Sequence, residues 1–216
     1  MNLAQFVLSN LPPPPARVLE IGCGAGELAR ALATARYDVT GIDPEAPEEP
    51  IFRRVTLADF DEPGPYDAVV ASRSLHHLPD LGTALDKVAR LLRPGGVLIL
   101  REFAKERLDE TTADWYFRQR RALAAAGGAE APATLADCRR EWEEEHTDIH
   151  GFEAMRRELD RRFVERFFAW EPYLYRELEG VASETLERTL VETGAIQATG
   201  WLYVGDYAPR EGGGPA

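Results

Sequence analysis

The sequence predicts an α/β fold with a mostly parallel, doubly wound sheet. Short apolar runs typical of buried strands alternate with segments of helical periodicity between residues 17 and 101. The runs end on polar residues, and the first leads straight into a glycine-rich turn. The residues at the other expected strand ends are Asp43, Asp59, Ser72 and Glu102. Because the carboxyl ends of parallel strands meet at one edge, we expect a single ligand site there.

The first half of the chain supplies most of the expected sheet. We expect helices over residues 2–10, 25–35 and 80–92, and strands over residues 17–21, 37–43, 51–56, 66–72 and 97–100. Three prolines within residues 44–50 exclude a regular helix, since proline lacks the backbone N–H that a helix needs. The crossover helix usual at this point should therefore be absent or a single turn.

The second half changes character after residue 102. Residues 103–180 are rich in charge, alanine, leucine and aromatics with helical spacing, and glycine and proline divide them into three or four helices. A last helix over 183–193 and one or two strands within 196–208 should complete the sheet. We therefore predict a core of residues 1–102 and 181–210, a helical lid over 103–180 inserted before the last helix, and a frayed tail over 211–216.

Composition limits the partners. The chain has 216 residues and a formal net charge of −12, which argues against a nucleic-acid partner, because phosphate binding needs a basic face. No apolar run approaches the roughly 20 residues that span a bilayer, and the first residues do not resemble a signal peptide. Cys23 and Cys138 lie far apart in dissimilar contexts. We expect a cytoplasmic protein without a membrane partner.

The glycine turn after the first strand is the strongest sign of a cofactor. Gly22, Gly24 and Gly26 allow a ligand close to the backbone, and the next helix points its free N–H groups at the turn. Residues 24–29 formally satisfy the G-x-G-x-x-A pattern of dinucleotide-binding proteins. Glu20 and Glu27 flank the turn, however, and carboxylates suit a ligand with a cationic part better than a pyrophosphate. Both cofactor classes remain open on this evidence.

Several motifs in order resemble those of class I S-adenosylmethionine-dependent methyltransferases, in particular the branch that acts on small molecules. They run over about residues 17–101 and comprise Val18-Leu19-Glu20-Ile21-Gly22-Cys23-Gly24-Ala25-Gly26, Gly41-Ile42-Asp43, Leu57-Ala58-Asp59-Phe60, Tyr66-Asp67-Ala68-Val69-Val70-Ala71-Ser72, Leu75-His76-His77-Leu78 and Leu91-Leu92-Arg93-Pro94-Gly95-Gly96. The set is more specific than any one motif. The resemblance implies a Rossmann-like fold, with S-adenosyl-L-methionine as cofactor and S-adenosyl-L-homocysteine as product.

The resemblance also implies roles for individual residues. The three glycines would cradle the methionine part of the cofactor, and Glu20 would lie beside its ammonium or sulfonium group. Asp43 would accept hydrogen bonds from both ribose hydroxyls. Asp59 would bind the adenine amino group, Phe60 would offer a backbone N–H or ring contact, and Ser72 would line the floor near the methyl group.

The candidates for catalysis are Glu102, His146 and His150. On a helix the two histidines would share a face, but Thr147 stands where the metalloprotease pattern needs glutamate, so we expect no metal. One histidine could line the acceptor pocket as general base, and a solvated helix face is the competing interpretation. The acidic charge and the lid favour a small-molecule acceptor. A non-catalytic cofactor-binding module and an NAD-dependent oxidoreductase are the alternatives, and the thin cover at residues 44–50 leaves room for a homodimer.

Overall fold

The computed structural model describes residues 2–178 and 181–209. The chain divides into two compact units, which we call the sheet unit and the helical unit. Among the described residues, the sheet unit comprises 2–102, 153–168 and 202–209, and the helical unit comprises 103–152, 169–178 and 181–201. The chain therefore enters the helical unit twice and returns to the sheet unit each time.

The sheet has seven strands in the order β3-β2-β1-β4-β5-β7-β6. Their bounds are Arg17–Ile21 for β1, Asp38–Ile42 for β2, Phe52–Arg53 for β3, Tyr66–Ser72 for β4, Leu92–Phe103 for β5, Phe163–Glu171 for β6 and Gly200–Tyr207 for β7. The pairs β1–β2, β1–β4, β2–β3 and β4–β5 are parallel. The prediction of an α/β fold with a mostly parallel sheet is confirmed.

Strand β7 runs against its neighbours. The ring of Phe163 at the start of β6 lies 6.2 Å from that of Tyr207 at the end of β7. The backbone N–H of Ala104, just beyond β5, donates to the carbonyl of Thr199, just before β7, at 2.7 Å. Each contact brings the end of one strand to the start of the other, which is the antiparallel relation.

Strand order reverses between β1 and β4, so the carboxyl ends of these two strands flank a topological switch point. Register keeps the two ends level, since Ile21 pairs with Ala71. This edge of the sheet is where the predicted glycine turn and the loop after β4 lie. It is the expected place for a ligand in a doubly wound sheet.

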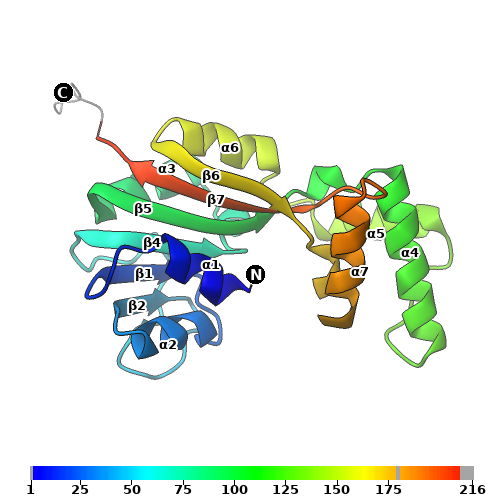
Figure 1. The fold of residues 1–216 in the computed structure, drawn as a ribbon, viewed down its shortest axis with the longest axis horizontal. Helices are drawn as coiled ribbons and strands as arrows, with labels where there is room; N and C mark the ends of the chain where they lie inside the picture. Colours follow the sequence, from blue (N-terminus) through cyan, green and yellow to red (C-terminus); the bar gives the residue numbers. More distant parts are fainter. Residues whose placement is uncertain (1, 179–180, 210–216) are drawn as a thin grey trace. The chain divides into compact units, whose positions relative to one another are not determined.

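Helices cover both faces of the sheet (Figure 1). The helices α1 (Leu3–Asn10) and α2 (Glu27–Thr34) pack on the face that carries Val18, Val70 and Ile99. Helix α3 (Leu81–Leu91) buries Leu85 and Val88, and α6 (Phe152–Asp160) buries Met155 and Leu159. Arg162, just after α6, joins this helix to α3 by an ion pair with Asp86 and a hydrogen bond to the Gly82 carbonyl.

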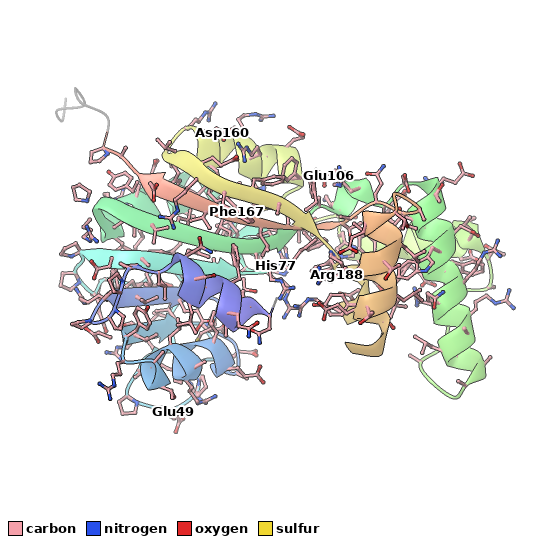
Figure 2. All side chains as sticks on the ribbon, in the orientation of Figure 1. Glu49, His77, Glu106, Asp160, Phe167 and Arg188 are labelled. Atoms are coloured by element: carbon pink, nitrogen blue, oxygen red, sulfur yellow. The ribbon has the colours of Figure 1, made fainter. Side chains whose placement is uncertain are left out.

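The crossover helix after β2 is absent, as the prolines predicted. Residues 43–51 form turns, and their cover comes from the segment itself. Ala46 is fully buried and Phe52 is 6% exposed in the core shared with α2. Glu49, labelled in Figure 2, pairs with Arg30 of α2. The segment is thus tied down within the sheet unit.

The helical unit contains α4 (Glu110–Ala125), α5 (Leu135–Glu145) and α7 (Val181–Glu192), with 3₁₀ turns at Lys105–Arg107 and Leu174–Arg176. Its core is aromatic: the ring of Phe103 stacks on that of Tyr173 at 4.6 Å and meets Trp142 edge-on. Glu187 of α7 is fully buried and accepts hydrogen bonds from the backbone N–H groups of Tyr173, Leu174 and Tyr175. This carboxylate holds the second 3₁₀ turn against the helix.

The observed boundaries differ from the predicted ones in two places. Residues 153–168, expected in the lid, belong to the sheet unit and include most of α6 and the first part of β6. Helix α7, expected in the core, belongs to the helical unit. Strand β6 escaped prediction because an edge strand with Val164–Phe167 exposed shows no apolar alternation. The expected tail over 211–216, together with residue 210 of the predicted core, lies outside the described residues.

Candidate cofactor-binding site

The three glycines of the turn after β1 have different roles. All have positive φ, at +71° for Gly22, +48° for Gly24 and +80° for Gly26. A Cβ on Gly22 would lie 2.5 Å from the Cβ of Ser74, and one on Gly26 would lie 2.3 Å from the ring of Phe52. A Cβ on Gly24 would meet no atom within 4 Å. Gly22 and Gly26 therefore make room for the protein's own Ser74 and Phe52 side chains, whereas Gly24 leaves space for a ligand.

Asp43 ties the end of β2 to this turn. Its Oδ2 accepts the Gly24 N–H at 3.0 Å, and its Oδ1 accepts the Glu45 N–H at 2.8 Å. The Gly22 and Cys23 N–H groups both donate to the carbonyl of Ile42 next to it. Each carboxylate oxygen of Asp43 keeps a further lone pair, so the group can accept additional hydrogen bonds.

Glu20 is a buried acid beneath the turn. Glu20 is 4% exposed, and its Oε2 has no hydrogen-bond partner among the described residues. Burial raises the pKa of the Glu20 carboxyl to about 8, while the Ala29 backbone N–H pulls the pKa down and the Asp43 charge adds to the rise. A neighbouring cation would reverse this effect, because it stabilises the ionised carboxylate.

A cavity of about 340 Å³ opens at the carboxyl edge of the sheet unit. Asp43 lines it together with residues from the turn after β1, the segment after β3 and the loop after β4. The other lining residues are Ile21, Gly22, Ile42, Pro44, Val55, Thr56, Leu57, Arg73, Ser74, His77, Leu78 and Pro79. Figure 2 marks His77 at this edge. The carboxyl ends of β1, β2 and β4 thus share one cavity.

Of the predicted cofactor-binding residues, Gly22 and Asp43 line this cavity, whereas Glu20, Gly24, Gly26, Asp59, Phe60 and Ser72 do not. The last three have other surroundings. Asp59 is exposed, and its carboxylate accepts a hydrogen bond from the Thr56 hydroxyl at 2.7 Å. Phe60 is 2% exposed and packs inward. Ser72 is half-buried and pairs with Arg101 of β5. The predicted roles of these three residues stay predictions.

The sequence motifs contained the signal for the lining residues that we did not name. Leu57 is the first residue of the third motif and Thr56 directly precedes it, and Ser74 and His77 flank the Leu75-His76 pair. The Ser74 hydroxyl donates to the Ile21 carbonyl at 2.9 Å, which joins the loop after β4 to the glycine turn. A residue's place in a motif therefore located the site to within two or three positions.

Glu102, predicted as a catalytic group, is fully buried at the end of β5. Its Oε1 accepts the backbone N–H groups of Ser74 and Leu75 at 2.9 and 2.7 Å, and its Oε2 lies 2.5 Å from Nδ1 of the buried His76. Both oxygens are engaged and neither reaches solvent. This geometry favours a role in holding the loop after β4, in place of the predicted general base.

His146 and His150 do not share a helix face, which corrects the expected arrangement. Helix α5 ends at Glu145, so His146 caps it and His150 follows a turn. The His146 Nδ1 lies 2.7 Å from the Trp142 carbonyl. Because a carbonyl only accepts, Nδ1 carries the proton and Nε2 presents a lone pair in the neutral ring.

The helical unit has a cavity of about 350 Å³ of its own. It is lined by Trp142, His146 and Leu108, with polar groups from Lys105, Glu106, Arg139, Glu143 and Thr147. Within residues 2–178 and 181–209, no group of three or more His, Cys, Asp or Glu side chains is arranged to hold a metal ion. Over the same residues, no helix has the length and apolar character needed to cross a bilayer.

Comparison with known proteins decides the family. The model of a methyltransferase domain family matches residues 2–130. The chain belongs to this methyltransferase family. The predicted resemblance to class I S-adenosylmethionine-dependent methyltransferases is confirmed, and the NAD alternative is set aside.

Solved structures show the same fold in other methyltransferases. The N-methyltransferase NodS from Bradyrhizobium japonicum superposes with a TM-score of 0.55 at 17% identity, covering 95% of this chain and 94% of NodS. The geranyl diphosphate C-methyltransferase from Streptomyces coelicolor gives a TM-score of 0.60 at 14% identity, covering 95% and 79%. Its structure contains S-adenosyl-L-homocysteine.

Curated relatives match over a shorter stretch. A ubiquinone biosynthesis O-methyltransferase from Alkalilimnicola ehrlichii is 39% identical over 99 residues, which is 38% of this chain and 40% of the relative. The relative of the same name from Xylella fastidiosa is 34% identical over 111 residues, which is 44% of this chain and 45% of the relative. The matches thus span less than half the length of these curated relatives.

S-adenosylmethionine is the cofactor of this methyltransferase, and the residues of the turn fit it. Gly24 leaves space where a Cβ would otherwise stand, and Glu20 has a buried oxygen without a partner. A buried carboxyl whose pKa is raised by burial fits a ligand with cationic groups, because such a ligand compensates the buried charge. A pyrophosphate would repel the ionised form of the same carboxyl and so gives it no compensation.

Proposed function

We propose that this methyltransferase transfers the methyl group of S-adenosylmethionine to a small-molecule acceptor that the helical unit binds. The observation that carries the proposal is the cavity in the helical unit. Its volume of about 350 Å³ falls at the small end of the range for ligand pockets, which is roughly 300–1,000 Å³. Trp142 and Leu108 supply apolar surface, and His146 and Arg139 supply polar groups.

Two further facts support a small acceptor. The net charge of −12 disfavours a polyanionic substrate, since a nucleic acid needs a basic face. The matched relatives are named ubiquinone biosynthesis O-methyltransferases, which points to a hydroxyl oxygen as the acceptor atom. We therefore extend the proposal to O-methylation of a phenolic or similar hydroxyl.

On the cofactor side, we propose that Asp43 accepts hydrogen bonds from the ribose hydroxyls. Its oxygens keep free lone pairs and it lines the cavity of the sheet unit. Gly24 would allow the close approach of the methionine part, and Glu20 would lie beside a cationic group. Asp59, Phe60 and Ser72 keep their predicted contacts with adenine and near the methyl group as proposals.

On the acceptor side, we propose His146 as the general base. When bound, the cofactor supplies a methyl group already activated on a sulfonium, so this chain mainly has to orient the acceptor and exclude water. The Trp142 carbonyl holds the proton on Nδ1 of His146, which leaves Nε2 to accept the hydroxyl proton. The imidazole ring also lies 4.1 Å from the Trp142 ring, which restrains its orientation.

The decisive experiment measures S-adenosyl-L-homocysteine release with a panel of phenols, catechols and amines, beside tRNA and protein acceptors. We expect turnover with a small hydroxyl compound, which His146→Gln lowers by about 10²–10⁴-fold in kcat. His150→Gln, measured in parallel, shows whether the second candidate histidine contributes. Turnover confined to a macromolecule would refute the small-molecule proposal. Cofactor binding without turnover on any acceptor would favour a non-catalytic module, which is the remaining alternative.

A further inference from the structure

Arg73 is a cationic side chain at the cofactor cavity for which the structure shows no partner. It follows β4 directly, is exposed, and lines the cavity of the sheet unit. Among the described lining residues it is the single lysine or arginine, and Asp43 is the single carboxylate. In the described part of the chain, no hydrogen-bond acceptor engages the Arg73 guanidinium. Five N–H donors are therefore directed to solvent or to a ligand.

The backbone at Arg73 is strained. Its φ is +55°, and Arg36, with φ +72°, is the other non-glycine residue of the described chain in the left-handed region. This region costs an L-residue roughly 1–2 kcal/mol, and only asparagine, aspartate and glycine visit it readily. The Arg73 N–H donates to the Arg101 carbonyl at 2.8 Å, so the sheet holds the conformation. Strain retained at the rim of a cavity suggests a functional reason.

Arg73 is the one lysine or arginine among the described residues that line the cavity, so it is the side chain suited to receive an anion. S-adenosylmethionine carries a single anionic group, the carboxylate of its amino-acid end, beside an ammonium and a sulfonium. Asp43 repels a carboxylate, whereas a planar guanidinium matches its two oxygens with paired N–H donors. Ser74, the next residue, packs directly against Gly22, which places the loop of Arg73 beside the turn that receives the methionine part.

We propose that Arg73 binds the carboxylate at the amino-acid end of the cofactor, and that its left-handed backbone directs the guanidinium into the cavity for this purpose. The proposal depends on the cofactor and not on the acceptor. A failure here would therefore leave the proposal of a small-molecule acceptor untouched.

The test compares two ligands that differ in the amino-acid end. Isothermal titration calorimetry would measure S-adenosyl-L-homocysteine and 5′-methylthioadenosine, which lacks the amino acid, on the wild type and on Arg73→Asn. Asparagine tolerates the left-handed region, so the fold is preserved. We expect Arg73→Asn to weaken S-adenosyl-L-homocysteine about tenfold or more and to leave 5′-methylthioadenosine within twofold. Arg36→Asn, which makes the same change in the turn after α2, should alter neither affinity.

Three outcomes decide the proposal. Selective loss of S-adenosyl-L-homocysteine affinity supports it, and partial recovery in Arg73→Lys adds that charge is the cause. Equal loss for both ligands overturns it, because the effect would then come from a disturbed cavity. Unchanged affinity for both ligands also overturns it, because the Arg73 guanidinium would then not contact the cofactor. A thermal melt of each variant identifies misfolding, and Arg73→Lys then serves as the deciding variant.

Discussion

Replacing Glu20 by glutamine should stabilise the protein in the absence of cofactor. The carboxyl has a pKa of about 8 in the fold, against 4.5 for the unperturbed group. Between these two values the folded state binds a proton that the unfolded chain releases, so stability falls as the pH rises from 4.5 to about 8. Above about pH 8 the stability contributed by the bound proton is fully lost, and below pH 4.5 it is fully present.

The size of the effect follows from the same two values. At pH 7, protonating a group whose unfolded pKa is 4.5 costs 2.5 pH units at about 1.4 kcal/mol each, or about 3 kcal/mol. Glutamine has the same shape without the charge and avoids that cost. For a chain of 216 residues this corresponds to a rise in Tm of roughly 6–12 °C, as an upper limit.

The assay is thermal and chemical unfolding of the wild type and Glu20→Gln between pH 5 and 8.5. The difference should grow with pH and level off above about pH 8. Glu27→Gln is the matched control, because Glu27 is exposed in the first turn of α2. A variant no more stable than the wild type at pH 7 would show that Glu20 is ionised and paired in the fold, against the reasoning here.

Cofactor binding should shift the pKa of the Glu20 carboxyl in the direction opposite to burial. A cationic ligand beside Glu20 lowers the pKa of the carboxyl, so binding at pH 7 should release up to one proton per site. Calorimetry in two buffers of different ionisation enthalpy measures that proton. Glu20→Gln should abolish the release and weaken binding.

Substitutions at four other positions test the packing of the site and of the helical unit. Gly24→Ala puts an L-residue at φ +48°, so it should cost about 1–2 kcal/mol through the backbone alone and should weaken S-adenosyl-L-homocysteine binding. Gly26→Ala has the same kind of backbone cost at φ +80° and also drives a Cβ into the Phe52 ring, so it should cost about 1–3 kcal/mol more in unfolding experiments. Glu102→Ala removes the buried partner of two backbone N–H groups and of His76, so we expect the free energy of unfolding to fall by about 3–5 kcal/mol. Glu102→Gln should lower it less. If Glu102→Gln keeps full activity per folded molecule, Glu102 is not the general base. Glu187→Ala leaves three buried N–H groups without an acceptor and should cost about 3 kcal/mol or more by denaturant titration, and an unchanged midpoint would contradict the role of this carboxylate.

The first half of the fold could be predicted from the sequence, and the class of cofactor followed from the resemblance of its ordered motifs to a known family. Local signals are strong there: apolar runs of strand length, the glycine turn, and the prolines that remove the helix after β2 all act through nearby backbone. The turn and Asp43 were located for the same reason. Glu20 was noticed as an acid, and its sign relative to the ligand already favoured a cationic cofactor.

Tertiary structure decided what each of these residues can do. Gly22 and Gly26 face Ser74 and Phe52, which lie far along the chain, so spacing could not show that Gly24 alone leaves open space. Glu102 ends a strand like a site residue, but its oxygens are taken by the loop after β4. Such contacts join distant segments, and sequence patterns record only neighbours.

The same reason explains the division into two units. The periodicity of residues 103–180 predicted helices correctly in part, but β6 lies at an exposed edge and its pattern is that of neither a buried strand nor a helix. Which unit a helix joins depends on where its apolar side packs, and α6 and α7 exchanged their expected places. The ordered motifs therefore identified the cofactor, and long-range packing decided which unit each helix joins.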